Sequence, residues 1–481
     1  MALATVCLLS CIALAATAQA LTARKTDAAG AADVTSAAQA AAAAATAGAA
    51  PAAPAAMETA VATAYDRPAP RPPRPRRVPL ARDFDVRLFE AIAEDIVANQ
   101  RVPGMAMAIV HDGKVLSARG YGITDVQNAE PVDAHTVFRM ASLSKSFAGT
   151  LAGLLVSEGA LRWDSPVADY IPSLQFSDPA AAQRLTVADV LSHRVGLKDH
   201  TYDREIERNA DYRDLVQKLA HAPMSCPPGE CYGYQNVAFS LIGDVVFAAS
   251  GQFYNEALAR RIFKPLGMHD ASVGLEGILA SPRWAKPHVR AGAGWRPVMP
   301  KPTYYRVAPA AGVNASISDL AQWLLAHSGH RPDVLPAPLL ATLHSPVVGT
   351  PAELRGPSWR RERLNAAGYG LGWRIFDYAG YRMVFHGGAV QGYRGVMAIL
   401  PELDLGVAIV WNCESALPSG LLPTILDRAI GLPAQPWIEV SPEIEASLYV
   451  SRDPGPEEAA PRSGHEVQGG PQATRATARP H

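Results

Sequence analysis

The sequence has few cysteines, no excess of charge of either sign and, after residue 20, no long apolar run. Its formal net charge of −1 gives no indication of a nucleic-acid partner, because binding phosphate requires clustered positive charge. No stretch beyond the first twenty residues is long and apolar enough to span a bilayer. The composition, 48% hydrophobic and 19% charged, instead predicts a globular protein with a sizeable core.

Several catalytic motifs are also missing. There is no G-x-S-x-G, which removes the nucleophile of an α/β-hydrolase. There is no H-E-x-x-H, the 13 histidines form no tight ligand cluster, and no phosphate-cradling Walker loop occurs. We therefore expect neither a cofactor nor a metal requirement.

The two ends of the chain differ in composition from the rest. Residues 1–20 are apolar and end in Ala-Gln-Ala, which predicts a secretory signal and a periplasmic or secreted protein. No Lys or Arg precedes the apolar stretch, and an uncleaved segment would be just long enough to anchor the chain in a membrane. Residues 21–80 are rich in alanine and proline, which predicts a disordered linker.

Strand patterns occur at both ends of the central region and helical patterns between them. GMAMAIVHDGKVLSARGYG predicts a hairpin, and strands return in YGLGWRIFDYAGYRMVFHGG and GYRGVMAILPELDLGVAIVWN. We therefore predict an α+β domain over 81–435, with one antiparallel sheet built from distant segments, flanking helices and a mostly helical lobe at about 150–330. Residues 436–481 form a C-terminal extension, with a disordered tail from about residue 451.

Cys226 and Cys231 lie close together in MSCPPGECYGY. In an exported protein they could form a small disulfide loop worth roughly 2 kcal/mol. Two free thiols are equally compatible with the sequence, because geometry decides the outcome.

Ser142 and Lys145 form an S-x-x-K pattern at the start of an apolar helical run. Positions i and i+3 share one helix face, so the lysine amine can reach the serine oxygen. A buried lysine with a lowered pKa could then remove the serine proton. Alone, the pattern fits equally well a serine N-cap followed by a surface lysine.

Two further motifs carry groups that could complete such a site. Tyr234 and Asn236 form the only Tyr-x-Asn in the chain, and a phenol can pass a proton to a leaving group. His386, Gly387 and Gly388 follow a strand pattern, where glycines allow a substrate backbone to approach the strand edge.

These three motifs in this order resemble the serine β-lactamase and penicillin-recognising hydrolase superfamily. The likeness is strongest to class C β-lactamases, D-alanyl-D-alanine carboxypeptidases and related esterases, and it covers roughly residues 83 to 430. It extends to LTVADVLSHRVGL, PAAGVNASISDLAQWL and HGGAVQGYRGVMAILPE.

The resemblance implies a role for each matched residue. Ser142 would be acylated, while Lys145 and Tyr234 would share the general-base work, in an order that the sequence leaves open. Asn236 would orient Lys145 and the substrate, and His386 would stand where β-lactamases carry a lysine. The backbone N–H groups of Ser142 and Ala389 would form an oxyanion hole, typically worth several kcal/mol to the transition state.

The strand triplet departs from the family pattern, since it is His-Gly-Gly and no Lys-Thr-Gly occurs anywhere. Gly387 offers no hydroxyl for a substrate carboxylate, which argues against efficient β-lactam hydrolysis. Arg394 could replace the lost carboxylate partner by bidentate pairing, although an Arg on the rim of the sheet is an equal alternative.

The sequence thus predicts an exported serine hydrolase that acts through an acyl-enzyme on an ester, an amide or a D-amino-acid peptide. The alternatives are a class C β-lactamase, a D-alanyl-D-alanine carboxypeptidase, or a non-hydrolysing sensor that binds penicillin or peptidoglycan. We expect a small-molecule or peptidoglycan-like substrate, no nucleic-acid partner, and membrane contact only if the N-terminal segment stays uncleaved.

Overall fold

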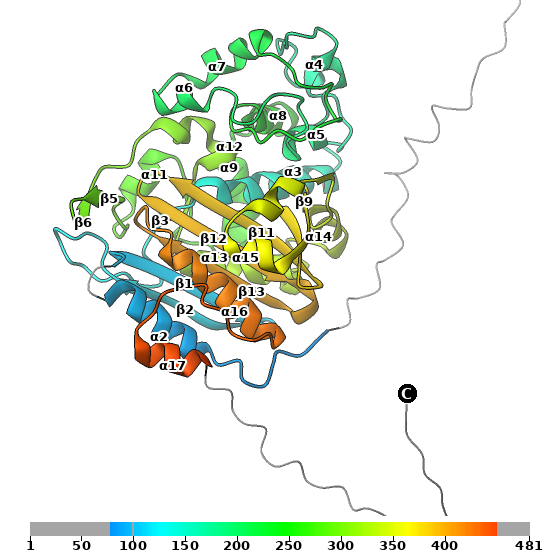
Figure 1. Cartoon of the computed structure of the whole chain (residues 1–481). Coiled ribbons are helices and arrows are strands. Elements are labelled where there is room, and N and C mark those ends of the chain that lie inside the picture. The colour runs from blue at the N-terminus through cyan, green and yellow to red at the C-terminus, as the bar shows by residue number, and fades with distance from the viewer. Residues whose placement is uncertain (1–76, 99–100, 450–481) are drawn as a thin grey trace, which may run out of the picture. The chain divides into compact units, whose positions relative to one another are not determined.

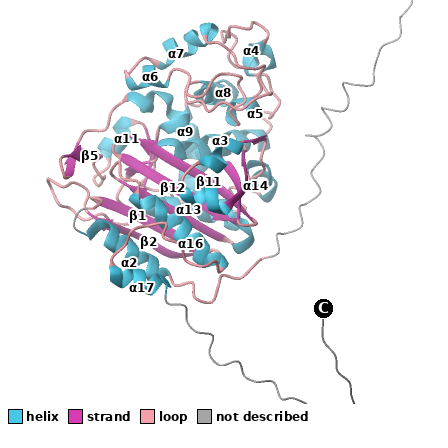
Figure 2. Ribbon diagram, in the orientation of Figure 1, coloured by secondary structure: helices cyan, strands magenta, loops and turns pink. Residues whose placement is uncertain are grey.

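The computed structural model describes residues 77–98 and 101–449, which belong to one compact unit. Its centre is an antiparallel eight-stranded sheet in the order β2-β1-β13-β12-β11-β10-β9-β8, in which the first and last strands of the chain lie side by side (Figures 1 and 2). The strands of this sheet are β1 Gly104–His111, β2 Lys114–Gly122, β8 Val348–Gly349, β9 Leu364–Tyr369, β10 Arg374–Tyr378, β11 Tyr381–Val390, β12 Tyr393–Leu400 and β13 Leu405–Trp411.

Both faces of the sheet are buried. Along β1, Met105, Met107 and Ile109 pack into a core with α2, α16 and α17, while the alternate residues Ala106 and Ala108 face a second core. Alternation of this kind follows from the period of two in a strand. Figure 1 shows α2, α16 and α17 together on one side of the sheet. These helices span Val86–Val97, Leu421–Ile430 and Pro442–Tyr449.

The other face carries α3, α13 and the inserted helical lobe. α3 (Ser144–Ser157) is buried almost all round, because the sheet lies on one side of it and the lobe on the other. The remaining helices are α4 Ala181–Arg184, α5 Val187–Leu191, α6 Asp203–Glu207, α7 Tyr212–Lys218, α8 Leu241–Ser250, α9 Tyr254–Leu258, α10 Lys264–Leu266, α11 Leu275–Ala280, α12 Ala308–Ala311, α13 Ile317–Leu325, α14 Ala337–Leu343 and α15 Ser358–Arg363.

The remaining short strands form two small sheets of their own. β3, β7 and β4 form one small antiparallel sheet, and β5 and β6 form a hairpin. Their bounds are β3 Phe138–Arg139, β4 Ser272–Val273, β5 His288–Ala291, β6 Gly294–Pro297 and β7 Val313–Ala315. Within the described residues no helix has both the length and the apolar character needed to cross a membrane.

The α+β prediction is confirmed, including the sheet closed by segments from both ends of the chain and the inserted lobe. Near the predicted boundary at residue 81, the Val78 N–H donates to the carbonyl of Glu402 at 2.8 Å. Within the predicted C-terminal extension, α17 packs against α2 and its Leu448 is buried. The predicted signal and the predicted tail lie outside the described residues.

Candidate functional site

Ser142 lies in a tight turn between β3 and α3. The residue before it, Ala141, has φ +48°, in the left-handed region that a residue with a Cβ enters at a cost of about 1–3 kcal/mol. The turn continues as the 3-10 helix η2, Ala141–Leu143, and leads directly into α3. Ser142 thereby stands at the N-terminal end of a fourteen-residue helix, where backbone N–H groups favour negative charge.

Lys145, one turn further on, is fully buried and its ammonium has three neighbours. Nζ lies 3.4 Å from Ser142 Oγ, 2.7 Å from Asn236 Oδ1 and 3.1 Å from the carbonyl oxygen of Ala310. Burial lowers the pKa of Lys145, although the nearby Tyr234 and Asp203 partly oppose this effect. A lysine held in this way is a suitable base for the serine proton.

Tyr234 and Asn236 come from the loop that follows the disulfide. The Tyr234 ring covers the lysine, with Nζ 4.7 Å from the ring centroid, and His193 packs against the ring with centroids 4.3 Å apart. Asn236 Nδ2 donates to Asp203 Oδ2 at 2.8 Å, which fixes the amide so that Oδ1 faces Lys145. The predicted juxtaposition of hydroxyl, amine and phenol is therefore present.

His386 is fully buried and does not line the cavity described below. Its Nδ1 lies 2.8 Å from the carbonyl of Gly387, so Nδ1 carries the proton and Nε2 accepts from the Tyr369 hydroxyl at 3.1 Å. Burial lowers the pKa of His386 well below its ordinary value, and the ring is neutral at pH 7. His386 lies on β11, the strand that the resemblance indicated, and its ring bonds Tyr369 and the Gly387 carbonyl inside the protein.

The strand next to the nucleophile approaches it closely because it carries glycine. A Cβ added to Gly388 would lie 2.6 Å from the Met140 carbonyl oxygen and 3.2 Å from the Ser142 nitrogen. The β11–β12 hairpin closes at the pair Val390 and Tyr393, and hydrogen-bonded and non-hydrogen-bonded pairs alternate from there. Ala389 occupies a non-hydrogen-bonded position, so its N–H points away from β12.

A cavity of about 1170 Å³ opens over these groups. Its lining includes Ser142, the three residues after His386, and Arg394. The Arg394 guanidinium donates through Nη1 to the carbonyls of Val390 and Tyr393, at 3.0 and 3.2 Å. The cavity is also lined by charged side chains from the lobe, from the segment before β9 and from the start of β10, namely Asp199, His200, Asp203, Arg204, Glu207, Glu353, Arg355, Arg360 and Arg374.

Two pairs of residues in this site, Asp203 with His200 and Arg374 with Glu353, belong to no catalytic motif in the sequence. Asp203 Oδ2 accepts from both Asn236 and His200 Nδ1, the latter at 2.6 Å, and this hydrogen bond raises the pKa of His200. Arg374 lies with its guanidinium carbon 5.4 Å from the Tyr234 ring centroid and is paired with Glu353. Asp203 meets Asn236, and Arg374 meets Glu353, only through tertiary contacts. His200 and Asp203 are three residues apart, but this spacing matches no catalytic motif.

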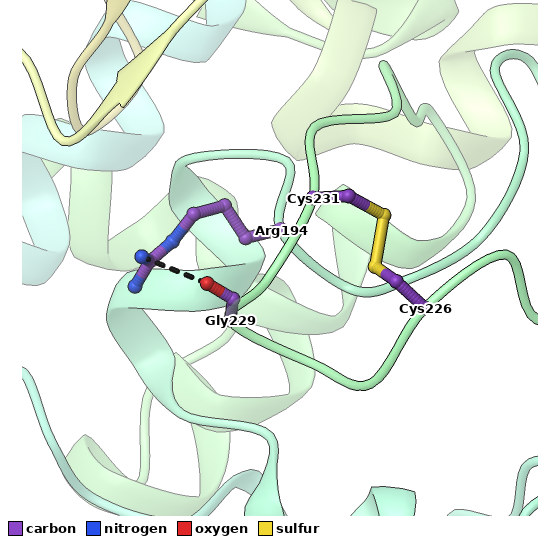
Figure 3. The surroundings of a disulfide bond; sticks show 4 residues. All are labelled: Arg194, Cys226, Gly229 and Cys231. Carbon is purple, nitrogen blue, oxygen red and sulfur yellow. Dashed lines mark hydrogen bonds between the residues drawn. A yellow bond between two sulfur atoms is a disulfide. The ribbon is translucent and has the colours of Figure 1, made fainter.

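Cys226 and Cys231 form a disulfide (Figure 3). The loop between them also contains Gly229, whose carbonyl accepts from Arg194 Nη1 at 3.1 Å, and the Arg194 guanidinium in turn bonds Asp189. The bridge therefore closes the segment immediately before Tyr234. Cys413 is free and buried. Across residues 77–98 and 101–449, no three His, Cys, Asp or Glu side chains come together as a metal-binding group.

Comparison with known proteins gives a family match and several relatives. The family model described as Beta-lactamase matches residues 89–431. Unguisins hydrolase ungD of Aspergillus violaceofuscus is 26% identical over 74% of this chain, and D-aminopeptidase of Gluconobacter oxydans is 28% identical over 76%. In each case the match covers 66% of the relative. Penicillin-binding protein 4 of Amycolatopsis lactamdurans is 28% identical over 68% of this chain and 86% of its own length.

Solved structures with the same architecture include a penicillin-binding protein homologue from Pyrococcus abyssi. It superposes with a TM-score of 0.64 at 25% identity and covers 72% of this chain and 78% of its own. The D-amino acid amidase from Ochrobactrum anthropi SV3 superposes with a TM-score of 0.58 at 21% identity, over 72% of this chain and 97% of its own, and it supports the fold alone.

Proposed function

Because the chain belongs to the beta-lactamase family, we propose that it is a serine hydrolase that forms an acyl-enzyme on Ser142. The observation that carries the proposal is the fully buried Lys145 ammonium, 3.4 Å from the Ser142 hydroxyl and bonded to Asn236. A cation that is removed from water without a carboxylate in direct contact favours its neutral form, which is the form a base needs.

In the acylation step, Ser142 Oγ attacks the substrate carbonyl carbon and its proton passes to Lys145 Nζ or to the phenolate form of Tyr234. The carbonyl oxygen becomes an oxyanion between the N–H groups of Ser142 and Ala389. Collapse of this intermediate breaks the bond to the leaving group, which takes up the proton from the same lysine–tyrosine pair. Water then attacks the ester, and the reverse proton path releases Ser142 and the product acid.

We propose an ester, an amide or a peptide as the substrate. The hydrolase and aminopeptidase names of the relatives support acyl transfer from amides and peptides. The first curated relatives extend beyond this chain, which spans 66% and 63% of their lengths. The strand triplet His-Gly-Gly, which lacks the lysine and the hydroxyl, argues against efficient β-lactam turnover.

The alternatives predict different kinetics with the same reagents. p-Nitrophenyl ester and nitrocefin are incubated with the protein and with Ser142→Ala. Steady ester turnover that the substitution abolishes supports the hydrolase, and fast nitrocefin turnover would favour a β-lactamase. A single stoichiometric burst would favour a non-hydrolysing sensor, and activity untouched by Ser142→Ala would remove the assignment.

We also propose that the protein works in the periplasm or outside the cell. The apolar residues 1–20 and the disulfide between Cys226 and Cys231 support an oxidising compartment. Its partner would be a small-molecule or peptidoglycan-like substrate, with no nucleic acid. Fractionation of the native host, followed by immunodetection of the mature chain, tests this location.

A further inference from the structure

Glu353 lies between two arginines at one end of the cavity. It comes from the 3-10 helix η9, Pro351–Arg355, and its two carboxylate oxygens bond Arg360 of α15 and Arg374 of β10. All three side chains are largely buried, with exposed fractions of 18%, 17% and 15% respectively. Two guanidinium groups therefore share a single carboxylate in a site from which most water is removed.

The other acidic groups of the cavity do not balance this cluster. Asp203 accepts from Asn236 and His200, and Asp199 accepts from the backbone N–H of Tyr234. Glu207 lies 3.4 Å from the Tyr304 hydroxyl, on the lobe. The arginine end of the cavity therefore keeps one positive charge that no carboxylate in contact with it neutralises, an arrangement that a buried site tolerates poorly without a counter-ion.

The two arginines also carry N–H donors that make no hydrogen bond within the cluster. Arg360 Nε is buried and has no hydrogen-bond partner among the described residues. Arg374 meets Glu353 through Nη1, so its other nitrogens remain for a second acceptor. Both arginines line the cavity together with Ser142. A planar guanidinium with two free donors matches the two oxygens of a carboxylate.

The cluster also stands close to the reacting groups. Both cations contact the Tyr234 ring, whose centroid lies 4.7 Å from Lys145 Nζ and 5.4 Å from the Arg374 guanidinium carbon. In the sheet, Arg374 pairs with Phe385, two residues before Gly387 of the open strand edge. A ligand bound to Arg374 would thus extend from the strand edge beside Ser142.

We propose that Arg374, supported by Arg360, binds a carboxylate group of the substrate, so that the hydrolase prefers esters, amides or peptides that carry one. This inference rests on the proposed function. It differs from the sequence-based assignment of carboxylate binding to Arg394, whose Nη1 is already engaged by the carbonyls of the β11–β12 hairpin. The arginine cluster therefore compensates for the hydroxyl that Gly387 lacks.

Two substrate pairs test the preference. Mono-p-nitrophenyl glutarate and p-nitrophenyl pentanoate differ by a carboxylate at the end of acyl chains of equal length. para-Carboxyphenyl acetate and phenyl acetate differ by a carboxylate on the leaving group. The ratio of kcat/KM within each pair is measured for the wild-type protein and for Arg374→Gln, Arg374→Lys and Arg394→Gln. The neutral member of each pair reports folding and the intact catalytic groups.

We expect the wild-type protein to prefer the carboxylated member of at least one pair. Arg374→Gln should reduce that ratio by about 10- to 100-fold, mostly through KM, because one charge-assisted hydrogen-bonded contact is lost. Arg374→Lys should recover part of it, since the charge remains without the planar fork. Equal ratios in wild-type protein and Arg374→Gln, or a loss confined to Arg394→Gln, would overturn the proposal.

A binding measurement distinguishes a failure of this inference from a failure of the proposed function. Calorimetric titration of Ser142→Ala with mono-p-nitrophenyl glutarate and with para-carboxyphenyl acetate, with and without Arg374→Gln, needs no turnover. Weaker binding of either ligand in the double variant supports the carboxylate subsite even if the protein hydrolyses neither ester. Unchanged binding of both ligands contradicts it even if ester hydrolysis depends on Ser142.

Discussion

Because β11 approaches the nucleophile closely, substitution by alanine should have very different effects on kcat at two adjacent glycines. A Cβ at Gly388 would lie 2.6 Å from the Met140 carbonyl oxygen and 3.3 Å from the Ala141 Cβ. Most of these neighbours belong to the backbone of the nucleophile turn, which cannot rotate away as the end of a side chain can. Gly388→Ala must therefore push the strand and Ser142 apart by several tenths of an ångström.

That displacement acts on the oxyanion hole, because its two proposed donors lie on either side of the contact. Losing one such donor costs about 10²- to 10³-fold in kcat, and a misplacement of about 1 Å costs about 10²-fold. We therefore expect kcat for a p-nitrophenyl ester to fall about 10²-fold in Gly388→Ala. Overpacking should also lower the free energy of unfolding, by about 1–3 kcal/mol.

Gly387→Ala is the matched control on the same strand. There the nearest atom to the added Cβ would be Phe385 Cζ at 3.5 Å, an ordinary contact. Its loss of kcat should be at least about tenfold smaller than that of Gly388→Ala, because a misplacement of the reacting groups by about 1 Å costs about 10²-fold and this contact requires none. Denaturant unfolding of both variants separates folding from catalysis. Equal losses in the two variants, or a fully active Gly388→Ala, would refute the close-approach argument.

Three further predictions follow from the buried groups. Lys145→Met should lower kcat/KM about 10²- to 10⁴-fold. In the wild-type protein, kcat/KM should rise with pH through a pKa below the ordinary 10.5 of lysine, because burial lowers the pKa of Lys145. A pH–rate profile measures this rise, and a profile that stays flat up to pH 10 would contradict it. Burial lowers the pKa of His344 to about 3 and holds the pKa of His327 well below its ordinary value, so only the unfolded chain takes up these protons as the pH falls below about 6.5. The free energy of unfolding should then decrease by up to about 1.4 kcal/mol per histidine for each pH unit. Guanidinium unfolding curves at pH 8 and pH 5 that superpose would contradict this prediction. Replacing Cys226 and Cys231 together by serine should cost about 2 kcal/mol of stability, and a melting temperature unaffected by the double change would show that the bridge constrains nothing.

Much of the fold could be predicted because local patterns and long-range packing agree. The alternation in GMAMAIVH matches a strand buried on both faces, with small and large residues directed to different cores. The Ser142 and Lys145 pair could be predicted because the two residues are three positions apart where η2 runs directly into α3. Tyr234 and Asn236 required the family pattern, since nothing local ties them to a lysine about ninety residues earlier.

Side-chain direction explains what the sequence could not predict. His386 stands on the expected strand, but its ring enters the core and bonds Tyr369. Arg374 follows the recognisable stretch YGLGW, yet its importance depends on Glu353, which lies in a segment without any motif. The sequence does not decide whether Cys226 and Cys231 form a disulfide, because the distance between the two sulfurs depends on the folded backbone.

The central claim is that Ser142 becomes acylated, and intact-protein mass spectrometry tests it most directly. The protein is incubated briefly with an activated ester and, separately, with penicillin, then quenched in acid and digested to locate the adduct. We expect a mass increase equal to the ester's acyl group on the peptide that contains Ser142. This increase should decay as product appears and should be absent in Ser142→Ala. Ester turnover without any adduct at Ser142, or an adduct on another residue, would contradict it.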